Sequence, residues 1–169
     1  MSVVEEGAAV EAGTGPTVRA QNIMTTPVWC AEEDWPVDRL AEFLIDRGIS
    51  GAPVLDEAGN LTGVVSLTDL VRVEGLAGRV RADASHGFYL QHLEHDLSRE
   101  DLATLSIDGS ASLRVGDIMT RDVLAVWPNT PAREIASLMR SSRVHRVIVA
   151  DHTGPVGIVS AMDLLALVE

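Results

Sequence analysis

Two serine–aspartate pairs with the same spacing are the residues of this chain best suited to binding chemistry. Ser66 and Asp69 stand in GVVSLTDL, and Ser160 and Asp163 stand in GIVSAMDL. A Ser-x-x-acid spacing is typical of a capping box, in which both side chains bind free backbone N–H groups at a helix start. A carboxylate held there can also accept hydrogen bonds from both hydroxyl groups of a ribose. Free N–H groups at the same helix start can bind phosphate.

A basic pair, His145 and Arg146, opens a predicted strand in RVHRVIV. Arginine binds phosphate through two parallel N–H groups, and histidine can add a second donor. The alternative is that Arg146 pairs with one of the many surface acids. The chain contains a second stretch of similar sequence, which has Ser50 and Gly51 at the matching positions. We call the stretch with Ser50 and Gly51 the first copy and the stretch with His145 and Arg146 the second copy. The sequence therefore predicts that the basic residues that bind phosphate come from the second copy.

The residue before each aspartate also differs between the copies. Thr68 precedes Asp69 and offers a hydroxyl that can contact phosphate, whereas Met162 precedes Asp163 and offers none. Together with the basic pair, this difference predicts two unequal sites.

These residues lie in an internal repeat. TVRAQNIMTTPV (17–28) matches SLRVGDIMTRDV (112–123), and the match continues to the two aspartates. In each copy, apolar periodicity and turn residues predict the order β-α-β-β-α, beginning with short strands at 28–31 and 123–126. The expected organisation is a flexible acidic tail (1–16), repeat 1 (17–73), a helical insert and linker (74–111), and repeat 2 (112–169).

The repeat resembles the tandem cystathionine-β-synthase (CBS) domain pair, also called a Bateman module. The marks present in both copies are Ile-Met-Thr, a strand such as ISGAPVLD or RVHRVIVAD, and the closing Gly-x-Val-Ser-x-x-Asp. The resemblance implies an α+β fold in which two repeats pack about a pseudo-two-fold axis, with the partly helical insert between them. It also implies clefts between the repeats that bind adenosine-containing ligands, and pairing of modules into a homodimer.

The resemblance further assigns roles to individual residues. Asp69 and Asp163 are the expected ribose-binding positions. The expected contacts of the ligand at the helix starts, including its phosphate, are Ser66, Thr68, Ser160, His145 and Arg146. The expected walls of the adenine pocket are Thr26, Ala31, Ile49, Ser50, Gly51, Val123, Val126 and Val144. Ordinary core packing explains the valines and the isoleucine equally well.

Composition limits the classes of partner. The formal net charge is −12, which argues against nucleic acid or an anionic membrane surface because both require a basic footprint. No apolar run is long enough to span a bilayer, and the acidic N-terminus lacks the features of a secretory signal. A single cysteine, Cys30, excludes an internal disulfide and favours a cytoplasmic protein.

Catalysis is not expected. His92 and His95 share a face of a predicted helix near His86, but no third ligand is secure, so a solvated helix face is favoured over a metal-dependent hydrolase. Cys30 lies in a predicted strand, which favours a buried apolar role over a nucleophilic one. We therefore predict no catalytic residues, no metal and no catalytic cofactor.

The expected function is a stand-alone regulatory module. It would bind AMP, ADP, ATP or S-adenosylmethionine between the repeats and signal by conformational change to a protein partner in trans, because no residues remain for a catalytic domain. The alternative is a dimerisation or interaction scaffold that binds no ligand, favoured by Met162 and by Ser50-Gly51.

Overall fold

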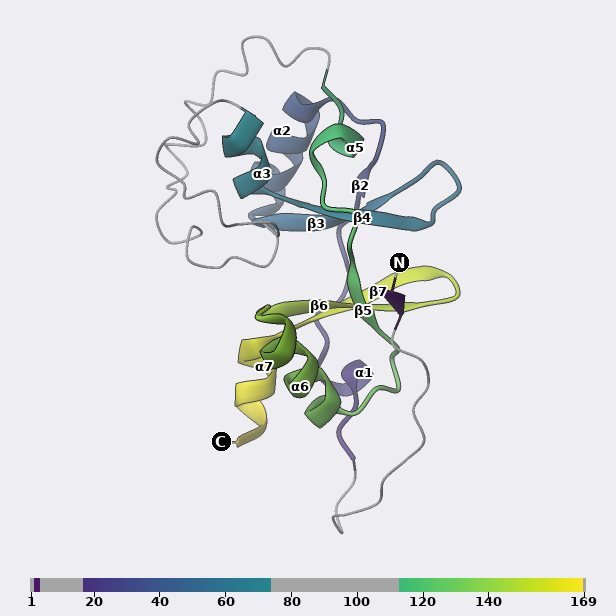
Figure 1. The fold of residues 1–169 in the computed structure, drawn as a ribbon, viewed down its shortest axis with the longest axis vertical. Coiled ribbons are helices and arrows are strands. Elements are labelled where there is room, and N and C mark those ends of the chain that lie inside the picture. The colour runs from purple at the N-terminus through teal and green to yellow at the C-terminus, as the bar shows by residue number, and fades with distance from the viewer. Residues whose placement is uncertain (1, 4–16, 74–112, 169) are drawn as a thin grey trace. The chain divides into compact units, whose positions relative to one another are not determined.

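The computed structural model describes residues 2–3, 17–73 and 113–168 (Figure 1). The expected insert, with His86, His92 and His95, lies outside these residues. So does most of the expected tail, but Ser2–Val3 (β1) differs from that expectation because it forms a strand parallel to β5, Leu124–Val126. Within the described part, none of the helices is long and apolar enough to cross a membrane.

Each repeat has the predicted order β-α-β-β-α. The elements of repeat 1 are β2 (Ala31–Glu32), α2 (Val37–Arg47), β3 (Gly51–Leu55), β4 (Leu61–Ser66) and α3 (Leu67–Val73). Those of repeat 2 are β5, α6 (Ala132–Ser142), β6 (Arg146–Asp151), β7 (Gly154–Ser160) and α7 (Ala161–Leu165), followed by the 3₁₀ turn η4 (Ala166–Val168). The α+β fold class is thereby confirmed.

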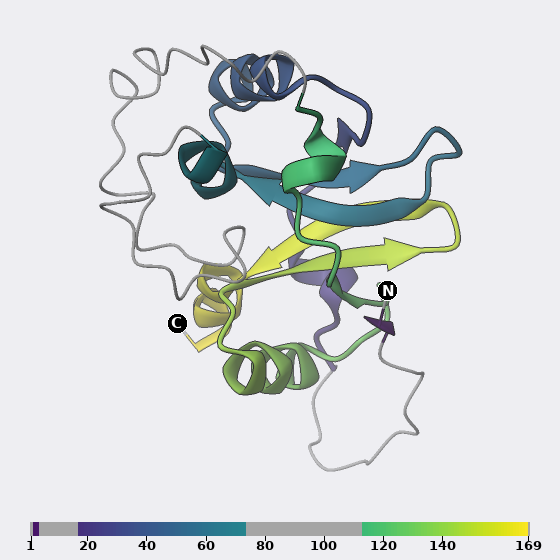
Figure 2. The ribbon, with the colours of Figure 1, turned by 45° about the horizontal axis from the view of Figure 1, so that its top comes forward.

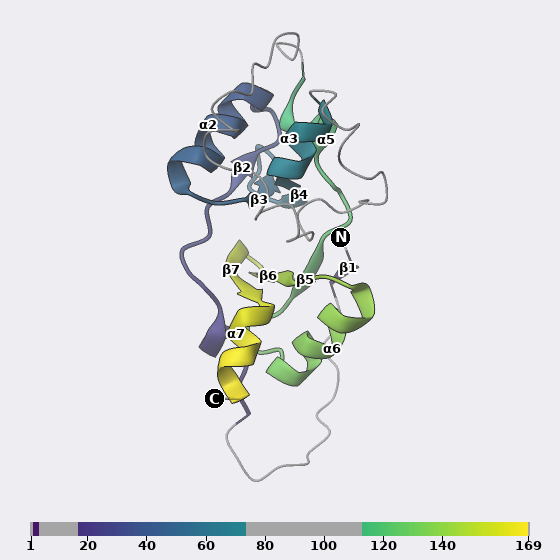
Figure 3. The same ribbon diagram turned by 90° about the vertical axis from the view of Figure 1, so that its left-hand side faces the viewer.

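The two sheets share one topology. In repeat 1, β2 pairs parallel to β3 and β3 pairs antiparallel to β4; in repeat 2, β5, β6 and β7 do the same. Figure 2 shows the two hairpins as the longest strand pairs of their sheets. In each unit the two helices of the β-α-β-β-α order cover one face of the sheet, as α6 and α7 do in Figure 3.

The first strand of repeat 1 begins later than predicted. The sequence predicts a strand at 28–31, but β2 begins at Ala31, where pairing with Val54 of β3 starts. Residues Val28 and Trp29 instead lie at the boundary between two compact units. Local β propensity therefore did not decide the strand, because parallel pairing with β3 sets where it starts.

The compact units do not coincide with the repeats of the sequence. One unit is Met1–Val28 with Val123–Glu169, and the other is Trp29–Asp122. The segment that leads into each repeat therefore packs with the other repeat. We call 17–28 and 113–122 the first and second lead-in segments; each contains a short helix, α1 (Ala20–Ile23) or α5 (Val115–Ile118), that the sequence analysis did not predict.

Each lead-in segment is held to the last strand of a sheet by a pair of backbone hydrogen bonds. The Thr25 N–H donates to the Ile158 carbonyl over 2.8 Å, and the Ile158 N–H donates back over 3.2 Å. Thr120 and Val64 exchange the same two bonds, both 2.9 Å long. Such reciprocal bonds satisfy the backbone groups of an exposed sheet edge.

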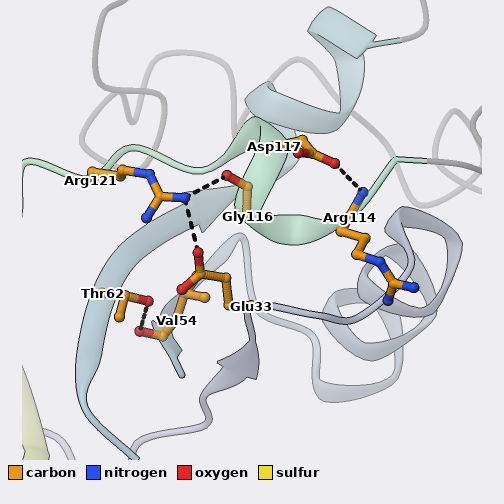
Figure 4. Close-up of polar contacts among 7 residues, drawn as sticks. All are labelled: Glu33, Val54, Thr62, Arg114, Gly116, Asp117 and Arg121. Atoms are coloured by element: carbon orange, nitrogen blue, oxygen red, sulfur yellow. Dashed lines mark hydrogen bonds and ion pairs between the residues drawn. The ribbon is translucent and has the colours of Figure 1, made fainter. Parts of the chain in front are cut away.

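Polar contacts fix the second lead-in segment further. The Arg121 guanidinium lies 2.9 Å from the Glu33 carboxylate and donates to the Gly116 carbonyl over 3.2 Å (Figure 4). The Asp117 carboxylate accepts from the Arg114 N–H over 2.9 Å at the start of α5. Val115 and Met119 of this segment belong to the same apolar core as Leu40, Leu44 and Val65 of repeat 1.

We expect Gly63→Ala and Gly157→Ala to destabilise the lead-in contacts. A Cβ atom at Gly63 would overlap the Met119 sulfur and lie 3.0 Å from the Thr120 carbonyl oxygen; one at Gly157 would overlap Met24 in the same way. Overpacking of this kind costs about 1–3 kcal/mol of unfolding free energy, measurable by urea titration. In a Met119→Ala background Gly63→Ala should cost less; an equal cost in both backgrounds would contradict the proposed overlap.

Candidate functional site

Both aspartates bind the serine at the helix start as predicted, and in the second motif the Asp163 N–H also donates to the Ser160 hydroxyl, which completes the capping box. Oδ2 of Asp69 accepts from the Ser66 backbone N–H over 2.8 Å and from its hydroxyl over 2.9 Å. Oδ2 of Asp163 accepts the same two bonds from Ser160, each 2.7 Å long. In each repeat one carboxylate oxygen is therefore committed to the helix start, and the orientation of the other oxygen, Oδ1, is fixed.

The start of the preceding strand pair lies beside each helix start. In repeat 1 the Ser50 carbonyl accepts from the first N–H of α3, at Leu67, over 2.9 Å. Gly51 of β3 pairs with Ser66 of β4. The antiparallel hairpin therefore brings Ser50 and Gly51 to the Asp69 motif.

Repeat 2 repeats this arrangement with basic residues. The His145 carbonyl accepts from the first N–H of α7, at Ala161, over 2.8 Å. Arg146 of β6 pairs with Ser160 of β7. The predicted phosphate-binding pair and the predicted ribose-binding acid therefore lie at one end of one hairpin, within a single compact unit.

The two motifs differ sharply in exposure. Ser66, Thr68 and Asp69 are 3%, 4% and 3% exposed. In the second motif Ser160 and Asp163 are half-buried, and Met162 is 66% exposed. The predicted inequality thus extends from the residue types to the accessibility of the carboxylates.

Arg72 contacts the first aspartate, and the sequence analysis did not identify it. Its Nη1 lies 3.3 Å from Oδ1 of Asp69. Burial raises the pKa of the Asp69 carboxyl above its ordinary value, although the bonds from Ser66 and the charge of Arg72 act in the opposite direction. The i,i+3 spacing of Asp69 and Arg72 on a helix was the signal that could have revealed the pair.

The predicted adenine-pocket residues are divided between the two units. Thr26, Val123, Val126 and Val144 belong to the unit of repeat 2, where Thr26 is exposed and the valines are buried. Ala31, Ile49, Ser50 and Gly51 belong to the unit of repeat 1. Ala31 is fully buried in the apolar core of that unit, with Ile49 packed against it, so core packing accounts for these two. The ligand role of all eight stays a prediction.

Catalytic chemistry gains no support from the described residues. Burial raises the pKa of the Cys30 thiol to about 11, so the thiol stays protonated at neutral pH, unlike an activated nucleophile. Across 17–73 and 113–168, no cluster of three or more His, Cys, Asp or Glu residues could hold a metal ion.

Comparison with known proteins identifies both repeats. The family model for the CBS domain matches residues 20–75 and 115–169. CBSX2, a chloroplastic CBS domain-containing protein of Arabidopsis thaliana, is 28% identical over 118 residues, which are 70% of this chain and 48% of that protein. The chain thus spans about half the length of CBSX2, and it spans 34% of an uncharacterized Methanopyrus kandleri protein, MK0525, that is 38% identical over 66 residues.

Three solved structures have the same fold. The CBS domain of a membrane protein from Sphaerobacter thermophilus is 28% identical with a TM-score of 0.65, covering 89% of this chain and 88% of that one. CBSX2 in complex with AMP is 22% identical with a TM-score of 0.63, covering 89% and 95%. The CBS domain pair of MJ0100, with 5′-methylthioadenosine and S-adenosyl-L-methionine, is 22% identical with a TM-score of 0.62, covering 90% and 97%.

We expect the Asp69 carboxyl to titrate above the ordinary aspartate value of about 3.9 when followed by carbon-detected NMR. Because the native state then binds this proton more tightly than the unfolded state, its contribution to the unfolding free energy falls as pH rises through the raised pKa. Arg72→Ala should raise the pKa further, since the cation that lowers it is gone. A carboxyl that titrates at or below about 3.9 would contradict the burial effect.

Proposed function

The chain belongs to the CBS-domain family, and on that premise we propose that it is a regulatory module that binds an adenosine-containing nucleotide and signals to a partner in trans. AMP, methylthioadenosine and S-adenosylmethionine, the ligands of the CBSX2 and MJ0100 structures, share an adenosine group. The ribose and adenine are therefore the parts of the ligand for which the chain must supply a site.

The observation that carries this proposal is the hydrogen bonding of the Asp163 carboxylate. Its Oδ2 is held by Ser160, and no partner of Oδ1 is present among the residues that the structure describes. A half-buried carboxylate oxygen with fixed orientation is a strong acceptor, because hydrogen bonds to charged groups exceed neutral ones in strength. A ribose supplies two adjacent hydroxyl donors that match it.

His145 and Arg146 supply the charge that a phosphate requires. They lie at the start of β6, and Arg146 pairs with Ser160 across the hairpin. In a chain of net charge −12, a local basic pair creates the positive potential that an anionic ligand needs. Because the basic pair and the acid lie at the same hairpin end, one ligand can present its ribose to Asp163 and its phosphate to Arg146.

The lead-in segments provide a route from binding to output. The first lead-in segment is held to β7 at Ile158, two residues before Ser160, and continues through Thr26 into the other unit. A ligand that prefers one arrangement of this hairpin end would shift the population of the connected segment as well. Under this proposal the protein is a homodimer in the cytoplasm, and its partner protein recognises the shifted conformation.

Asp163→Ala should weaken AMP binding by roughly 10- to 100-fold, the loss expected for hydrogen bonds to a charged group. The fold should persist, because the Ser160 hydroxyl accepts from the backbone N–H of residue 163 over 3.3 Å, and an alanine keeps that N–H. Isothermal titration calorimetry with AMP, ADP, ATP and S-adenosylmethionine measures the affinity, and a thermal melt checks the fold.

Asp46→Ala is the matched control, since it removes one exposed carboxylate from α2 in the other unit. Equal affinities for Asp163→Ala and this control would contradict the ribose role. If none of the four ligands bound to the wild-type chain while it remained dimeric, the scaffold function would replace the sensor function.

Arg146→Ala should weaken AMP and ATP far more than adenosine, because only the first two carry phosphate. Arg140→Ala removes an exposed positive charge from α6 in the same unit and should affect all three ligands equally. The measurement is the ratio of AMP to adenosine dissociation constants in each variant. If the ratio in Arg146→Ala equalled that of the wild-type chain, the phosphate contact would be refuted.

A further inference from the structure

We propose that Arg72 is an internal competitor for the ligand position at Asp69, so that the chain binds one adenosyl ligand, at Asp163, and keeps its first site closed. This inference rests on the proposed function and concerns the regulation of the same motif. Its physical basis is a contact that only one of the two aspartates makes, although both accept the same two bonds from the serine three residues earlier.

The two aspartates have equivalent hydrogen bonds at Oδ2 but not at Oδ1. In both motifs Oδ2 accepts a backbone and a hydroxyl bond from the serine three residues earlier. In the first motif Oδ1 faces the Arg72 guanidinium at 3.3 Å. The residue three positions after Asp163 is Ala166, which cannot make this contact.

The contact uses the carboxylate oxygen that a ribose would need. A ligand at Asp69 must displace the guanidinium and leave that charge to find another partner. It must also open the motif, because Asp69 and its neighbours Ser66 and Thr68 are at most 4% exposed. Desolvated charge pairs resist the removal of one partner, since the remaining charge loses its compensation. Asp163 is free of both costs.

The pair is nevertheless able to open. The Arg72 side chain is 31% exposed, so its guanidinium can move into water without crossing the core. Arg72 therefore acts as a removable block whose strength is set by one side chain. The second repeat provides the natural comparison, because it has alanine at the same place.

The test exchanges the residue types at the two matching positions, 72 and 166. We expect calorimetry with AMP to give one site per wild-type chain and two sites per chain in Arg72→Ala, the added site disappearing in Arg72→Ala/Asp69→Ala. Arg72→Lys keeps a positive charge at this position and should keep one site. The reciprocal change, Ala166→Arg, should weaken AMP at Asp163 by roughly tenfold or more, within the range for one hydrogen bond to a charged group.

The outcomes separate this inference from the proposed function. Two sites per wild-type chain would overturn the block while the nucleotide-binding function stands. So would a weaker single site in Arg72→Ala, because Arg72 would then be a ligand contact. No AMP binding by the wild-type chain, with one site gained in Arg72→Ala, would support the block at Asp69 but overturn the site at Asp163. No binding by either protein would overturn both proposals, and thermal melts of each variant exclude misfolding as the cause.

Discussion

The structure depends above all on the reciprocal backbone bonds between each lead-in segment and the last strand of a sheet. Thr25 binds Ile158 and Thr120 binds Val64, and in each case a glycine on the strand leaves room for the methionine beside the threonine. These bonds give each compact unit residues from both repeats. Neither repeat, cut at its sequence boundaries, contains the segment that covers its own sheet edge. Each lead-in segment therefore continues along the chain from the unit in which it packs into the other unit.

Within each unit, helix capping and ligand binding have the same geometric requirement. The bonds from Ser160 to Asp163 start α7 and also fix the direction of the second carboxylate oxygen. A side chain that is already ordered loses little conformational entropy when a ligand arrives. The capping interpretation and the binding interpretation of Ser-x-x-Asp are therefore compatible with each other.

The features that could be predicted from the sequence were those set by neighbours in the chain. The order β-α-β-β-α followed from short-range periodicity, and the Ser–Asp bonds followed from a spacing of three residues. The exchange of lead-in segments could not be predicted in this way, because Thr25 and Ile158 are distant in the chain. The start of β2 at Ala31 had the same origin, since pairing with Val54 decided it. Arg72 was different: its spacing from Asp69 was visible, but a repeat comparison favours residues that match, and Ala166 does not.

The two motifs differ in where basic residues lie relative to the aspartate. At Asp69 the compensating cation lies on the same helix, within one turn, and the carboxylate is buried while the Arg72 side chain is partly exposed. At Asp163 the basic residues lie on the neighbouring strand, next to the serine rather than three residues beyond the acid. Under the proposed function, a cation at that place compensates a bound phosphate, and the ribose hydroxyls bind the carboxylate. If both proposals hold, the position of one basic residue relative to the aspartate decides whether this Ser-x-x-Asp motif is a structural element or a ligand site.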